Sequence, residues 1–138
     1  MWKGLLFIFS AIALISGCQS SQNFNATKIK SPKWVSIGEN SYGDLSYVDT
    51  NSIFGDRKVK TAWSKLIYKK CGKKEEFCEL IIKNEYDCVN QTTRFLSGNA
   101  FKFSVPVQTE NNIGQWRKVQ PGSIGAYEFN LVCFNELD

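Results

Sequence analysis

Residues 34–105 alternate between short apolar or aromatic runs and polar, turn-prone stretches, a pattern that predicts β-strands. The strand candidates are KWVSIG, LSYVDT, KVKTAWSKLIYKK, ELIIKNEYDC, TTRFLS and AFKFSV. The alternation is clearest in ELIIKNEYDC, where one face carries Leu80, Ile82, Tyr86 and Cys88. In AFKFSV one face carries Phe101, Phe103 and Val105. The connections are too short for helical crossovers, so we expect about five or six antiparallel strands, with Cys88 turned toward the core.

The carboxyl-terminal segment PGSIGAYEFNLVCFNELD fits both a strand and a helix by periodicity. Pro121, Gly122 and Ser123 form a start signal, with Ser123 as the N-cap, and this signal favours a helix. The helix would carry two apolar arcs. The first arc contains Ala126, Phe129, Val132 and Cys133. The second arc contains Ile124, Tyr127, Leu131 and Phe134.

A bond between the inward Cys88 and Cys133 would lay the first arc on the sheet. The second arc would then need a cover, which is a loop of the same chain, a curved sheet that wraps both arcs, or another copy in a homodimer. We therefore expect an α+β fold, with the antiparallel sheet packed against a C-terminal helix, and the second arc as a candidate self-association surface.

The amino terminus has the charged, apolar and small-residue order of a secretory signal. Lys3 precedes the apolar residues 4–15, and Ser16 and Gly17 stand before Cys18. The apolar run is shorter than the ~20 residues of a spanning helix, which disfavours a transmembrane anchor, and a buried helix is the other alternative. The ISGC sequence resembles a bacterial lipobox, which implies that Cys18 is acylated and tethers the chain to a membrane.

This interpretation divides the chain into a signal peptide (1–17), a lipidated cysteine with a flexible polar tether (18–32), and one domain (33–138). Gln19, rather than Asp, follows the cysteine, which resembles the sorting pattern of the outer membrane. Of the 17 basic and 13 acidic residues, only Lys3 lies in the signal peptide. The remaining positive excess is too small to predict nucleic-acid binding.

Four cysteines remain beside Cys18, an even number in a chain bound for an oxidising compartment. They allow three pairings. Cys71 and Cys78 flank the short GKKEEF segment, so a local bridge that closes a hairpin is the least costly pairing, and it leaves Cys88 with Cys133. A zinc site is the alternative, but the chain has no histidine and no closely spaced Cys-x-x-Cys pair.

No residue is assigned a catalytic role. The chain contains no histidine, which removes the usual base of serine and cysteine hydrolases, and it lacks a phosphate-binding glycine motif. Asp44 and Asp49 could pair as glycosidase carboxylates, but a turn residue and a strand-end residue are the simpler interpretation. We expect a protein that binds, without enzymatic activity, cofactor or metal.

Two features are candidate ligand contacts. The hairpin lysines Lys69, Lys70, Lys73 and Lys74 gather positive charge, either as solvated charge or as a contact for acidic host molecules. Trp34, Trp63 and Trp116 are expected to pack on the sheet, but an exposed Trp116 would instead anchor a partner.

Several short segments, in this order, resemble the surface-adhesin protein E family of small Gram-negative lipoproteins. The segments are WVSIG, YVDTNSI with the later Trp63, EYDCVNQTTRF, and PGS followed by Cys133. The resemblance covers about residues 34–134, and KKCGKKEEFC departs from it because its cysteine pair has no match in the family pattern.

The resemblance implies an antiparallel sheet with a C-terminal helix, a Cys88–Cys133 disulfide, and dimerisation. It also implies display at the bacterial surface and binding of host extracellular-matrix or serum proteins. The alternative function is a periplasm-facing accessory lipoprotein that docks onto an envelope complex through the second arc of the helix.

Overall fold

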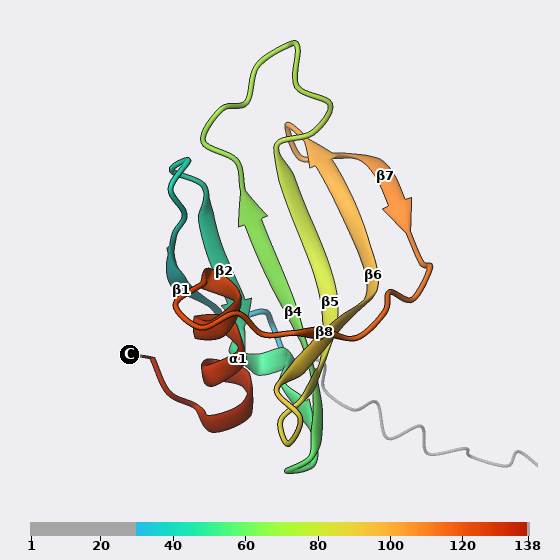
Figure 1. Ribbon diagram of the computed structural model, residues 1–138. Coiled ribbons are helices and arrows are strands. Elements are labelled where there is room, and N and C mark those ends of the chain that lie inside the picture. The colour runs from blue at the N-terminus through green and yellow to red at the C-terminus, as the bar shows by residue number, and fades with distance from the viewer. Residues whose placement is uncertain (1–29, 138) are drawn as a thin grey trace, which may run out of the picture.

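Eight strands and one α-helix follow one another in the residues that the computed structural model describes, 30–137 (Figure 1). The strands are β1 (Trp34–Glu39), β2 (Leu45–Asp49), β3 (Phe54–Gly55), β4 (Val59–Ile67), β5 (Glu79–Asp87), β6 (Thr92–Lys102), β7 (Val105–Glu110) and β8 (Arg117–Lys118). A short 3-10 helix, Thr50–Ser52, follows β2, and α1 (Ile124–Phe134) ends the fold.

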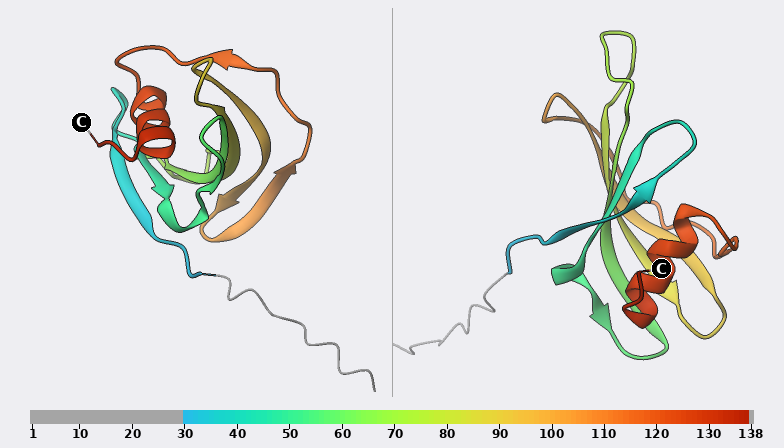
Figure 2. Two further views of the ribbon diagram at one scale, coloured as in Figure 1. Left: turned by 90° about the horizontal axis from the view of Figure 1, so that it is seen from below. Right: turned by 90° about the vertical axis from the view of Figure 1, so that its left-hand side faces the viewer.

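The strands form one antiparallel sheet in the order β1-β2-β4-β5-β6-β7, with β3 paired to β4 and β8 paired to β6. The sheet curls, and α1 lies inside the curl (Figure 2). The predicted fold class is confirmed: a curled antiparallel sheet packs against one C-terminal helix, and two disulfides hold it. As predicted, Tyr86 and Cys88 turn to the core side.

The predicted boundary between the last two strands is wrong. β6 runs without interruption through TTRFLS to Lys102, and the chain then reverses at Phe103 and Ser104, whose φ angles are 47° and 66°. Because Lys102 pairs with Val105, only these two residues form the hairpin turn, and left-handed angles at both suit the twist of such a turn. Phe103 therefore lies exposed in a turn, and β7 follows it.

The helix begins and ends at caps. Ser123 is the N-cap, as predicted, and its hydroxyl accepts a hydrogen bond from the Ala126 amide at 3.1 Å. Asn135 ends the helix in the left-handed conformation. The buried residues of the helix are Phe129, Leu131, Val132 and Cys133.

The second apolar arc of the helix is not an exposed face. Leu131 is 3% exposed, and Ile124 packs against the core, so only Tyr127 and Phe134 remain exposed. Of the three covers considered for this arc, the structure shows the curved sheet. β1 comes so close that a Cβ atom at Gly38 would lie 3.1 Å from Ile124 Cδ1, so the curved sheet covers part of both arcs. The arc predicted for self-association is thereby divided.

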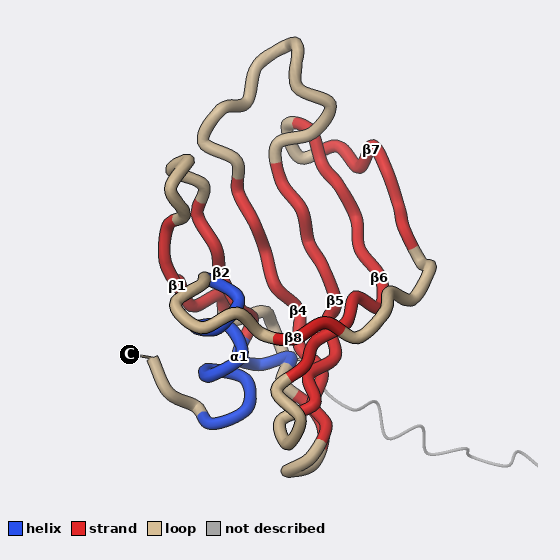
Figure 3. Tube along the Cα trace, in the orientation of Figure 1, coloured by secondary structure: helices blue, strands red, loops and turns tan. Residues whose placement is uncertain are grey.

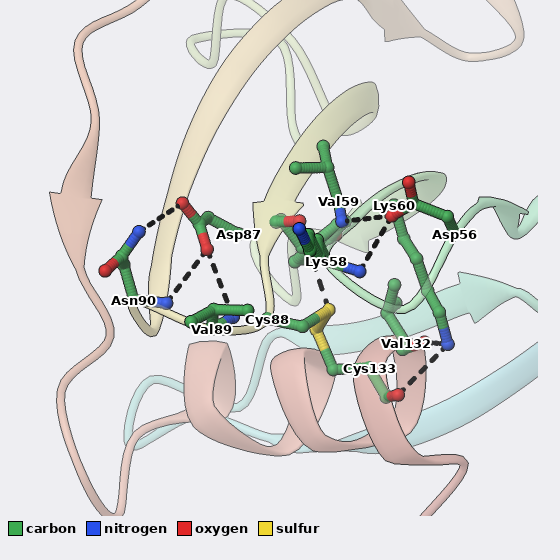
Figure 4. The surroundings of a disulfide bond; sticks show 11 residues. Asp56, Lys58, Val59, Lys60, Asp87, Cys88, Val89, Asn90, Val132 and Cys133 are labelled. Carbon is green, nitrogen blue, oxygen red and sulfur yellow. Dashed lines mark hydrogen bonds between the residues drawn. A yellow bond between two sulfur atoms is a disulfide. The ribbon is translucent and has the colours of Figure 1, made fainter.

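The Cys88–Cys133 disulfide joins the end of β5 to the last turn of α1, with 5.6 Å between the Cα atoms (Figure 4). The Cys88 amide donates to the Lys58 carbonyl at 2.8 Å, which holds this corner to β4. The Lys60 ammonium donates to the carbonyls of Val132 and Cys133, each at 3.0 Å. A cation at this position satisfies helix-end carbonyls and complements the helix dipole.

A polar cluster ties the middle of the helix to the sheet. The Glu128 carboxylate accepts hydrogen bonds from Tyr86, from Ser64 at 2.6 Å and from Asn84 at 3.2 Å. Burial, together with the neighbouring Glu128 carboxylate, raises the pKa of Tyr86 well above 10.0. The buried phenol is therefore neutral and serves as a donor.

Candidate functional site

The loop between β4 and β5, residues 68–78, projects beyond the end of the sheet and is named the disulfide loop here (Figure 3). The Cys71–Cys78 disulfide closes it, with 5.2 Å between the Cα atoms. At its base, the Tyr68 amide donates to the Cys78 carbonyl at 2.9 Å. The Cys78 amide in turn donates to the Phe101 carbonyl at 2.8 Å, so the loop stands on the ladder of the sheet.

Two side chains hold the disulfide loop from the sheet on either side. Asp44 precedes β2, and its carboxylate accepts from the Lys69 amide at 3.0 Å. Lys102, at the end of β6, donates its ammonium to the Lys73 carbonyl at 3.1 Å and to the Glu75 carbonyl at 2.5 Å. These bonds are made to backbone atoms of the loop, so they fix its path without involving its lysine side chains.

The disulfide loop carries more positive than negative charge. The side chains of Lys69, Lys70, Lys73 and Lys74 are all exposed. Glu75 is half-buried, and its carboxylate accepts from the Gly72 amide at 2.7 Å, whereas Glu76 is exposed. The loop therefore presents a positively charged tip to solvent.

The acid at the base of the disulfide loop is ionised at neutral pH. The Lys69 amide is the main cause, with help from the Asn40 side chain, and together they hold the pKa of Asp44 below its ordinary 3.8. Asp49 is used in a similar way, because its Oδ1 accepts from the Lys33 amide at 2.7 Å and from the Asn51 amide at 3.0 Å. Both carboxylates therefore bind backbone amides.

Trp116 lies away from the disulfide loop. It stands next to β8, which pairs with the first residues of β6, whereas the loop contacts the last residues of β6 (Figure 1). Trp116 is 41% exposed, and the Arg94 guanidinium lies over its ring, 4.6 Å from the ring centroid. Arg94 also pairs with Glu85 at 2.7 Å. The structure therefore does not bring Trp116 and the four lysines into one site.

The inner face of the sheet has an apolar pocket of about 180 Å³, which the sequence pattern did not predict. The pocket lies beside the disulfide loop and is lined chiefly by Phe77, Leu80, Ile82, Phe95 and Ala100. The alternation of β5 assigned Leu80 and Ile82 to the core face correctly. The short helix covers that face only near Tyr86. The other end of the same row of β5 side chains, at Leu80 and Ile82, therefore stays half-buried. Only the helix position reveals this opening.

Cys18 and the predicted signal and tether segments, as far as residue 29, lie outside the described residues. None of the helices in residues 30–137 has the length and apolar character that crossing a membrane requires. In the same part of the chain, no group of three or more acidic or cysteine side chains is placed to hold a metal ion.

The fold and the loop define a small disulfide-held domain, a sheet curled around one helix, with a charged loop at one end. The family model of surface-adhesin protein E matches residues 34–134. The chain therefore belongs to the surface-adhesin protein E family, as its sequence motifs indicated. No curated protein matches the chain.

Proposed function

We propose that this protein is an outer-membrane lipoprotein that binds host extracellular-matrix or serum proteins and has no enzymatic activity. Membership of a surface-adhesin family supports an adhesin-like role at the cell surface. In this proposal Cys18 carries the lipid, and residues 19–32 tether the domain to the membrane. Many tethered copies on one surface would strengthen individually weak contacts.

The observation that carries the proposal is the disulfide loop with its four exposed lysines. A loop fixed by a disulfide and by bonds to Asp44 and Lys102 loses little freedom when a partner binds. Exposed charges of one sign accelerate association with partners of opposite charge. The partner surface is therefore acidic.

The test replaces Lys69, Lys70, Lys73 and Lys74 by serine and measures binding to a panel of immobilised plasma and matrix proteins. We expect binding to fall by about tenfold or more, and to weaken with salt in the native protein, because contacts between exposed charges are screened. The thermal midpoint should stay nearly unchanged, since these side chains are exposed.

A matched variant removes four exposed cations elsewhere: Lys30, Lys33, Arg57 and Lys58 are replaced by serine. It loses the same charge but keeps the disulfide loop. Equal losses in both variants would mean that only net charge matters, and unaltered binding in the loop variant would refute the loop as the contact.

A further inference from the structure

The outer face of the sheet carries a shallow aromatic depression of about 300 Å³. Its lining includes Trp34, Asp49, Trp63, Ile81, Asn99 and Phe101. Trp63 stands between Ala62 and Ser64, which are buried on the helix side, so its own side chain takes the opposite face. The depression is therefore separate from the core, and from the apolar pocket on the inner face.

The strand register assembles this outer-face depression from five strands, β1, β2, β4, β5 and β6. Trp34 of β1 pairs with Asp49 of β2, and Ile81 of β5 pairs with Asn99 of β6. Trp63 of β4 lies between these pairs. The aromatic residues are half-buried, so their rings are fixed against the sheet and part of each is open to solvent.

Two lysines stand on this face. The Lys65 ammonium lies 4.5 Å from the centroid of the Trp34 ring and 5.3 Å from that of Tyr47. These cation–π contacts hold the charge beside the depression. Lys83 is the cross-strand partner of Trp63, so its side chain leaves the sheet on the same face.

Two of the nearby acids are already engaged, whereas Glu79, the cross-strand partner of Phe101, stands on the same face with its carboxylate available. Asp49 accepts two backbone amides through one oxygen and is 6% exposed. Glu85 forms a salt bridge with Arg94 at 2.7 Å. Near Trp34 and Trp63 the charge offered to a ligand is therefore positive, and the Glu79 carboxylate lies at the Phe101 end.

We propose that the outer-face depression binds a saccharide that bears a carboxylate. The flat ring of Trp63 matches the apolar C–H face of a sugar, and Lys65 and Lys83 match its carboxylate. Asn99 supplies a polar group for hydroxyls, and the volume is in the range of small-ligand sites, roughly 300–1,000 Å³. An acyl chain would instead suit the inner pocket, whose lining is almost wholly apolar.

The experiment titrates the full-length protein in detergent micelles with 3′-sialyllactose and with a hyaluronan tetrasaccharide, by calorimetry and saturation-transfer NMR. Lactose is the matched neutral probe, and inorganic phosphate is the matched anion without a ring. We expect at least one acidic saccharide to bind about tenfold or more tightly than lactose, because lactose lacks the carboxylate. Phosphate should compete weakly, because it has no apolar face.

Variants at the depression locate the site. Trp63→Ala should reduce saccharide affinity by about tenfold or more, and Trp63→Phe, which keeps a ring and guards against misfolding, by less. Lys83→Gln should reduce affinity for the acidic probes and leave lactose unchanged. The serine variant of the disulfide loop should bind these saccharides normally, so this inference and the proposed function fail separately.

Three results would overturn the inference. The first is that neither acidic saccharide binds. The second is that binding survives in a folded Trp63→Ala protein, and the third is that phosphate competes as well as the saccharides do. A further result would also show that the inference is wrong. If the protein binds no saccharide but binds vesicles of phosphatidylglycerol, and Trp63→Ala abolishes that vesicle binding, the face is a membrane-contact surface.

Discussion

At the scale of single residues, Tyr86 joins the sheet to the helix through a side-chain hydrogen bond. It is 1% exposed, and its hydroxyl donates to Glu128, which also accepts from Ser64 and Asn84. Glu128 is half-buried, and all three donors bind its Oε1, which offsets the hydration that this oxygen loses. The cluster therefore sets the position of α1 along the sheet.

We expect Tyr86→Phe to lower the free energy of unfolding at neutral pH by about 2 kcal/mol, since a hydrogen bond to a charged group is lost. The pKa of Tyr86 in the folded protein lies well above 10.0, because of burial and the Glu128 carboxylate. In the unfolded chain the phenol ionises near pH 10, so its stabilising contribution is full below that pH and declines above it. The deficit of Tyr86→Phe should therefore shrink above pH 10.

Urea unfolding at neutral pH and above pH 10 measures this prediction. Tyr127→Phe is the control, because Tyr127 lies on the exposed side of the same helix. A deficit of Tyr86→Phe that grows with pH, or that Tyr127→Phe matches, would contradict the role of the cluster.

At the scale of elements, the end of α1 depends on a lysine from β4. Lys60→Met keeps the apolar stem and removes the ammonium that donates to the Val132 and Cys133 carbonyls. We expect a loss of about 1 kcal/mol in the free energy of unfolding, the usual size of such a helix-end contact. Lys58→Met, at an exposed position nearby, should cost less, and thermal or urea unfolding compares the two.

Most strands and the helix could be predicted from the local sequence pattern. Where the pattern did not suffice, the reason is physical. The alternation of β5 and the Ser123 cap depend on neighbours in sequence, so both were predicted. The β6–β7 turn was missed because Phe103 continues the apolar alternation although it lies in the turn. Which of the possible covers buries Leu131 could not be chosen from the sequence, because the curl of the sheet results from long-range packing.

The two proposed binding surfaces also differ in how far the sequence reveals them. The charge of the disulfide loop is visible in sequence because its lysines are close neighbours. The outer-face depression is not, because it joins Trp34, Trp63 and Asn99 from strands that only the register brings together. An isolated tryptophan in a strand pattern does not indicate which face it takes or what lies beside it.

At the scale of the whole molecule, the two disulfides have different tasks. The Cys88–Cys133 bond spans 45 positions and the Cys71–Cys78 bond spans 7. In the chain-entropy model these loops correspond to about 4 and about 2.5 kcal/mol. We expect a Cys88→Ala/Cys133→Ala variant to show the larger loss of stability of the two, because the helix is no longer bonded to the sheet. Thermal unfolding measures this loss.

The Cys71→Ala/Cys78→Ala variant should lower the thermal midpoint less, while the disulfide loop becomes faster in amide hydrogen exchange. Its ligand binding should then weaken although the domain stays folded. Equal midpoints for the two variants would contradict this division between a global and a local bond.

The orientation of the domain at the envelope decides between the two functions. If Cys18 holds the domain at the cell surface, protease added to intact cells should degrade it, because the proposed tether leaves it outside the membrane. A Cys18→Ser protein, which cannot be acylated, should be protected in intact cells and degraded only after permeabilisation. Protection of the native protein until permeabilisation would contradict the adhesin proposal. It would favour a periplasm-facing accessory lipoprotein, for which the exposed Tyr127 and Phe134 are what remains of the docking arc.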